Sequence, residues 1–164
     1  MSQYFHASKT TEVLRDLMRI NSDRTNGYQG ASYHYENLDS SIRNAFNMIA
    51  SEGNCYVHDL QQKLKQLDGG AKSITVPGKI YRAWSDLKVE FAYNTQKSMI
   101  SSFLYNEEIA LHTYEAAISN LPGLNIDIIQ FLEVQADGLK KNYEQLKRYR
   151  KISYSSETSL MYLV

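Results

Sequence analysis

The sequence predicts an all-helical domain built from four long amphipathic helices. Apolar residues recur at spacings of three and four along most of the 164-residue chain, which is the period of a helix. Prolines are rare, at positions 77 and 122 only, so long helices are not interrupted. No stretch alternates apolar and polar residues as a half-buried strand would.

The first long helix is expected from about residue 11 to residue 37, after a flexible leader over residues 1–10. The residues expected to face the core along this helix are apolar at both ends and polar in the middle, and we call them its inward line. The polar middle consists of Asn21, Arg24 and Tyr28. The line continues across Gly27 and Gly30, so we predict a helix although each glycine costs it roughly 1 kcal/mol.

The second long helix is expected from about residue 41 to residue 67, before a glycine stop at residues 69–70. Gly53 lies in the middle of its apolar line, where the missing side chain leaves space or lets a neighbouring group approach closely.

A short helix over about residues 79–91 is expected in the segment that follows. Roughly 13 helical residues span about 20 Å, which is enough to climb the length of the other helices. The second and third long helices would then be parallel. A single long crossover of this kind is typical of ferritin-like bundles.

The third and fourth long helices are expected over about residues 95–120 and 125–150, with a C-terminal tail over residues 151–164 that is disordered or docked. Each has a polar residue in the middle of its apolar stripe, Glu107 in the third and Gln135 in the fourth. A carboxylate on an apolar stripe must be paired, protonated, bound to a metal or reached by water.

The midpoints of four helices of similar length lie at the same level, so we predict one buried polar layer. Its members are Asn21, Arg24, Tyr28, Glu107 and Gln135. Arg24 is a cation where a metal ion would have to bind, and a guanidinium pairs with a carboxylate through two bonds. We therefore expect Arg24 to neutralise Glu107, with no cofactor and no catalytic residue.

The alternative is iron or another divalent metal at a reduced carboxylate site. Glu107, Glu52 and Glu133 would be its ligands. Ferritin-like sites need more than this, with a Glu from two helices and a Glu-x-x-His from each of the others.

Composition excludes several classes of function. With 18 basic and 18 acidic residues, the chain gives no electrostatic reason to expect nucleic acid as a partner. It has no apolar run of the roughly 20 residues that span a bilayer. A single cysteine, Cys55, cannot form an intrachain disulfide, and we expect a cytoplasmic protein.

Three stretches and one single residue carry a resemblance to a known family. They are Asn21-Ser-Asp-Arg24-Thr-Asn-Gly27-Tyr28, Val76-Pro-Gly-Lys79-Ile-Tyr-Arg-Ala-Trp84-Ser-Asp-Leu-Lys88, Asn106-Glu107-Glu108 with the following Tyr114-Glu-Ala-Ala, and Gln135. Over about residues 11–150 the chain resembles a bacterial family of ferritin-like four-helix bundles, of the domain of unknown function 2383 type. The resemblance implies the fold and brings no established catalytic residues.

Together these observations favour a non-catalytic structural or interaction protein with a metal-free polar core, associated with stress by analogy with ferritin-like relatives. We expect a homo-oligomer, most simply a dimer. A metal-binding or oxidoreductase protein with its site around Glu107 is the alternative, so whether the chain is an enzyme stays open.

Overall fold

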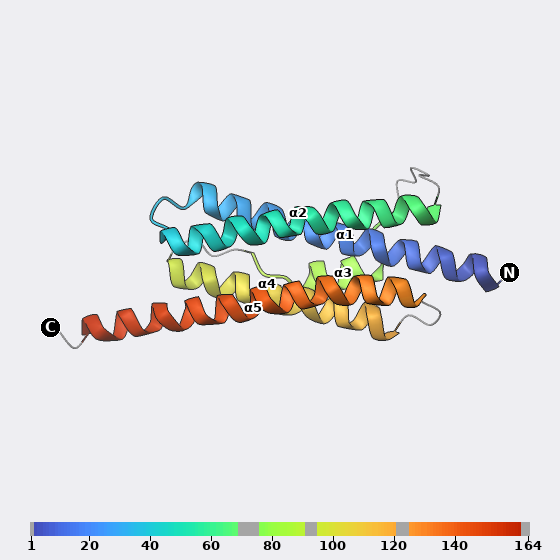
Figure 1. Cartoon of the computed structure of the whole chain (residues 1–164). Coiled ribbons are helices and arrows are strands. Elements are labelled where there is room, and N and C mark those ends of the chain that lie inside the picture. The colour runs from blue at the N-terminus through green and yellow to red at the C-terminus, as the bar shows by residue number, and fades with distance from the viewer. Residues whose placement is uncertain (1, 69–75, 91–94, 121–124, 162–164) are drawn as a thin grey trace.

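The computed structural model describes residues 2–68, 76–90, 95–120 and 125–161, and five helices account for most of them. The helices are α1 (Ser2–His34), α2 (Ser40–Asp68), α3 (Lys79–Leu87), α4 (Gln96–Asn120) and α5 (Ile126–Met161) (Figure 1). These ranges contain no strand, so the predicted all-helical class is confirmed.

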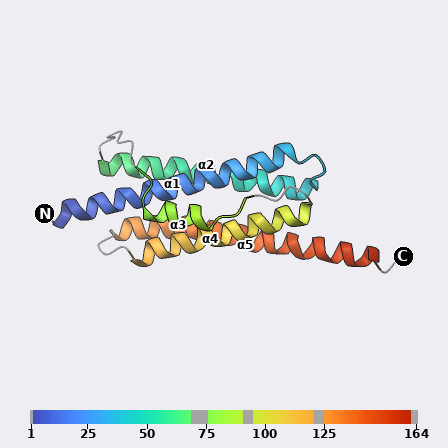
Figure 2. The same ribbon diagram turned by 180° about the vertical axis from the view of Figure 1, so that it is seen from behind.

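The four long helices form two antiparallel pairs, α1 with α2 and α4 with α5 (Figures 1 and 2). Helices α2 and α4 point in the same direction, as predicted, and residues 76–90 are the described part of the segment between them. Within this segment α3 lies against both α1 and α4. None of the helices in the described ranges combines the length and apolar character needed to cross a bilayer.

The apolar core has two parts along the helices. The first part is centred on Leu17, Leu60, Tyr114 and Leu132, and the second on Tyr28, Phe46, Phe103 and Leu146. Each part draws on all four long helices, because the three-and-four spacing keeps one face of every helix inward. Buried Asn21, Arg24 and Glu107 lie between the two parts along α1 and α4.

Two helices extend beyond their predicted ends. Helix α1 begins at Ser2 rather than near residue 11, and α5 continues to Met161 rather than ending near residue 150. Neither extension contains glycine or proline, and adding a residue to an existing helix is far easier than starting a new one. Residues 1 and 162–164 lie outside the described residues.

Two other ends come earlier than predicted. Helix α1 stops at His34 rather than near residue 37, and a turn follows in which the backbone nitrogen of Leu38 donates to the carbonyl of Tyr35. Helix α3 stops at Leu87, and Lys88 has an extended backbone. Residue 91, the predicted end of α3, and the glycine stop at residues 69–70 lie outside the described residues.

Gly53 brings α1 and α2 close together. The residue is buried in α2, and a Cβ atom at this position would collide with the hydroxyl oxygen of Thr25 on α1. Of the two expectations for this glycine, the close approach of a neighbouring group is confirmed.

Candidate functional site

A buried ion pair joins α1 to α4 between the two parts of the core. Arg24 donates from Nε to Oε1 of Glu107 and from Nη2 to Oε2, each at 2.8 Å. The hydroxyl of Tyr28 donates to Oε1 of Glu107 at 2.9 Å. The two charged side chains are only 3% and 1% exposed, so water screens their attraction very little.

Hydrogen bonds continue from this pair to α5. Arg24 Nη1 donates to Oδ1 of Asn21, and Nδ2 of Asn21 donates to the hydroxyl of Tyr114, both at 2.6 Å. The hydroxyl of Tyr114 donates in turn to Oε1 of Gln135 at 2.7 Å. The network therefore links α1, α4 and α5 through side chains alone.

The structure brings all five residues of the predicted polar layer into this network. Gln135 does not bond to the ion pair itself, because Tyr114 lies between it and Asn21. Tyr114 was not among the residues predicted for the layer. Its position seven residues after Glu107 on the same stripe was the available signal, because a buried phenol needs a hydrogen-bond partner.

Burial and charge control protonation in this layer. Burial alone would lower the pKa of Arg24, but the Glu107 carboxylate outweighs it, so the pKa is raised and the guanidinium stays charged. Burial and the Glu107 charge raise the pKa of Tyr28 well above its usual value, and burial raises the pKa of Tyr114. Both phenols therefore stay protonated and donate.

A second cluster of polar side chains lies between α2 and α5. Oε1 of Glu52 accepts from Nδ2 of Asn142 at 3.0 Å. Burial, together with a hydrogen bond to Glu52, raises the pKa of Tyr56. A Cβ atom at Gly138 would collide with the Tyr56 hydroxyl, so Tyr56 would have to move for a larger residue to stand there.

The carboxylates named for the alternative metal site are not brought together. Glu107 is held by Arg24, Glu52 is bonded to Asn142, and Glu133 is exposed on α5. Across the described residues, no group of three or more His, Cys, Asp or Glu side chains could hold a metal ion.

Side chains of α1 and α4 anchor the crossover. Asp16, buried in α1, accepts from the backbone nitrogens of Gly78 and Tyr81 at 2.9 and 3.1 Å. It therefore caps the N-terminus of α3 from another helix and complements the dipole of α3. Asn106 of α4 donates to the carbonyl of Val89 and accepts from its nitrogen, both at 2.9 Å. The segment is thus fixed at two points.

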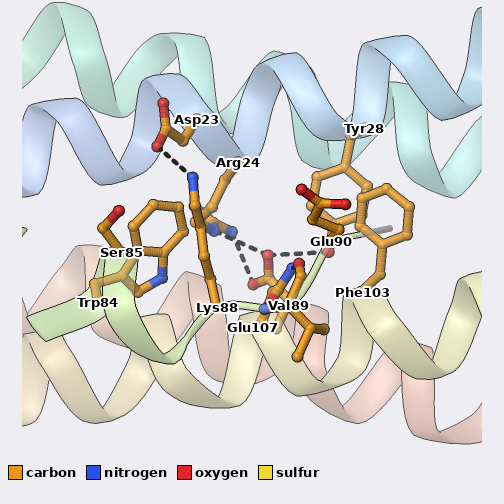
Figure 3. A pocket seen from close by; sticks show the side chains of 11 residues that line it. Asp23, Arg24, Tyr28, Trp84, Ser85, Lys88, Val89, Glu90, Phe103 and Glu107 are labelled. Carbon is orange, nitrogen blue, oxygen red and sulfur yellow. Dashed lines mark hydrogen bonds and ion pairs between the residues drawn. The ribbon is translucent and has the colours of Figure 1, made fainter. Parts of the chain in front are cut away.

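A cleft of about 550 Å³ opens beside the ion pair, between α1, α4 and the segment that contains α3 (Figure 3). Three aromatic side chains, Tyr28, Trp84 and Phe103, contribute to its walls. Lys88 lies across it, with Nζ 3.0 Å from Oδ2 of Asp23 and 4.5 Å from the centre of the Trp84 ring. The tyrosine and the phenylalanine are stacked, with their ring centres 4.3 Å apart.

Sequence reasoning assigned no role to Asp16 or Asn106. A signal was present for Asp16, since an acidic residue beside Leu17 lies at the edge of the inward line of α1 and raises the same question as Glu107. Asn106 carries no such signal, because its partner is the backbone of a segment whose path the sequence does not show.

Comparison with known proteins identifies a family. The family model described as "Domain of unknown function (DUF2383)" matches residues 9–120, which run from α1 through the end of α4. The predicted extent of the resemblance, about residues 11–150, is therefore supported as far as residue 120. Searches of curated proteins and of solved structures found no match. Because the family model covers more than half of the chain, the chain belongs to the DUF2383 family.

Proposed function

We propose that this chain is a non-catalytic structural or interaction protein. In its buried polar layer the carboxylate charge is neutralised by an arginine instead of a metal ion. The observation that carries the proposal is the two-point bond between Arg24 and Glu107. Both carboxylate oxygens accept from the guanidinium, so a cation already occupies the position beside them. A second cation there would meet the positive charge of Arg24 at short range in a poorly screened environment.

The proposed architecture is the ferritin-like four-helix bundle, and the bacterial, stress-associated role follows from that analogy. The long crossover and the parallel course of α2 and α4 support the analogy. The polar layer lies in the middle of the helices, where carboxylate proteins of this architecture hold their metals. In this proposal the chain keeps the four-helix architecture of such a protein, and Arg24 supplies the positive charge that a metal ion would otherwise supply.

We also propose a cytoplasmic homodimer that does not bind nucleic acid or membrane. The balanced charge of the chain and its single, exposed, free cysteine support this assignment. Sedimentation of the purified protein over a range of concentrations tests the dimer, and a monomer at every concentration would overturn that part of the proposal.

Metal analysis tests the proposed function directly. Protein purified without chelator is incubated with ferrous iron or with zinc, desalted and analysed, beside Glu107→Gln and a surface control, Glu144→Gln. We expect no stoichiometric metal in any of them. Stoichiometric retention by the wild type and the control, but not by Glu107→Gln, would show a working metal site at this layer and overturn the proposal.

A further inference from the structure

The cleft beside the ion pair has a buried hydrogen-bond donor without a partner. Trp84 is 2% exposed, and its Nε1 has no hydrogen-bond partner among the described residues. Trp84 lines the cleft, and Figure 3 shows the nitrogen on the side of the ring that faces Lys88 and Glu107. A buried donor without a partner costs free energy, so an acceptor that enters the cleft would be stabilised there.

The cations of the cleft are already neutralised. Arg24 is paired with Glu107, and Lys88 is paired with Asp23. Glu90 also lines the cleft, is exposed at its rim, and has no ion pair or hydrogen bond among the described residues. The charge in the cleft that has no counter-ion within the described ranges is therefore the negative charge of Glu90.

The two groups without partners lie at opposite ends of the cleft. Figure 3 shows Trp84 on one side of the Arg24–Glu107 pair and Glu90 on the other, beside Phe103. Apolar and aromatic surface lies near the Glu90 end, where Val89, Phe103 and Tyr28 line the cleft. Its volume of about 550 Å³ falls in the range typical of small-molecule sites, roughly 300–1,000 Å³.

We propose that this cleft binds a small organic amine that carries a hydrogen-bond acceptor at the end opposite its ammonium group. The acceptor receives the hydrogen bond of Trp84 Nε1, the ammonium group pairs with Glu90, and the apolar body packs between them. This inference goes beyond the proposed function, because ligand binding in the cleft does not depend on whether the role of the polar layer is purely structural.

Three para-substituted benzene derivatives of similar size test the proposal. The first, 4-methoxybenzylamine, has both features. The second, 4-ethylbenzylamine, replaces the ether oxygen with a methylene group, and the third, 4-methoxybenzoate, replaces the amine with an anion. Trp84 is the only tryptophan of the chain, so its fluorescence reports directly on occupancy of the cleft. Ligand-observed NMR gives an independent affinity.

We expect the methoxy amine to bind saturably and the ethyl amine to bind about tenfold more weakly, because it leaves the indole donor unpaired. The benzoate should bind most weakly. Glu90→Gln should weaken the methoxy amine by about two- to fivefold, as for an exposed ion pair. Glu133→Gln, at an exposed carboxylate on α5 outside the cleft, should change nothing.

A tryptophan substitution separates the indole donor from its ring. Trp84→Phe keeps an aromatic wall, and NMR should then find equal affinities for the two amines. Equal affinities in the wild type, tighter binding of the benzoate, or no saturable binding of any probe would each overturn the proposal. The last result would mean that the cleft holds only water. None of these results bears on metal retention, so the proposed function is tested separately.

Discussion

Glu107→Gln should remove a large part of the stability of this protein. The substitution keeps the size of the side chain and leaves Arg24 as a buried charge without a counter-ion. Two unit charges about 4 Å apart attract by about 4 kcal/mol at an effective dielectric constant of about 20. Removing one member of a buried ion pair typically costs about 3–5 kcal/mol. We therefore expect the free energy of unfolding to fall by about that amount, out of roughly 5–15 kcal/mol for a typical domain.

Urea denaturation followed by Trp84 fluorescence and by circular dichroism measures this change. The matched control is Glu144→Gln, which breaks the pair between Glu144 and Lys147 on the surface of α5. Those side chains are 51% and 43% exposed, so the control should cost less than about 1 kcal/mol.

A double substitution separates the loss of the pair from the cost of an orphaned charge. Arg24→Met with Glu107→Met removes both charges and keeps apolar volume in the layer, and replacement of a buried pair in this way is often neutral or stabilising. We expect it to recover part of the stability lost in Glu107→Gln, because the buried hydroxyl of Tyr28 loses its acceptor. If Glu107→Gln loses no more stability than the surface control, the reasoning about a desolvated pair is refuted.

Three further predictions concern other parts of the structure. The pKa values of Tyr28 and Tyr114 are raised in the folded state. Their contribution to stability is therefore complete below the ordinary tyrosine pKa of about 10 and declines as the pH rises above it. Urea denaturation at a series of alkaline pH values should show a shallower decline of stability when either residue is replaced by Phe. Gly53→Ala should destabilise the protein by about 1–3 kcal/mol, because the new methyl group meets the Thr25 hydroxyl on α1. Gly30→Ala, with open space around it, should stabilise the protein by up to about 1 kcal/mol. Thermal unfolding distinguishes the two, and equal effects would contradict the close approach of α1 and α2 at Gly53. Asp16→Ala removes the cap of α3 and should cost about 1–2 kcal/mol, with a red shift of the tryptophan emission, and an unchanged spectrum would show that α3 does not need this anchor.

The sequence predicted the helices and the ion pair for the same physical reason. A period of 3.6 residues identifies one inward face, and any charge on that face needs a partner. Arg24 and Glu107 satisfy this requirement for each other. The same geometry places Glu133 away from the core, because residues two positions apart are about 200° apart around a helix, and Gln135 is buried whereas Glu133 is exposed.

What the sequence could not predict depends on where the crossover lies in space. Asp16 and Asn106 bind backbone groups of this segment, which can be located only when its path is known. The cleft depends on the same path, since Trp84 and Lys88 belong to that segment. The helix ends were inaccurate for another reason, because no local residue forces α1 to begin at Thr11 or α5 to end at Arg150.

The position of the ion pair in the chain has a consequence for the order of folding. Each antiparallel helix pair can form from neighbouring segments, but Arg24 and Glu107 are 83 residues apart and belong to different pairs. The charges must therefore lose their water when the two halves dock, after most local structure has formed. We expect this docking step to limit the rate, so that charge-free variants of the layer fold faster than the wild type even where their stability is equal.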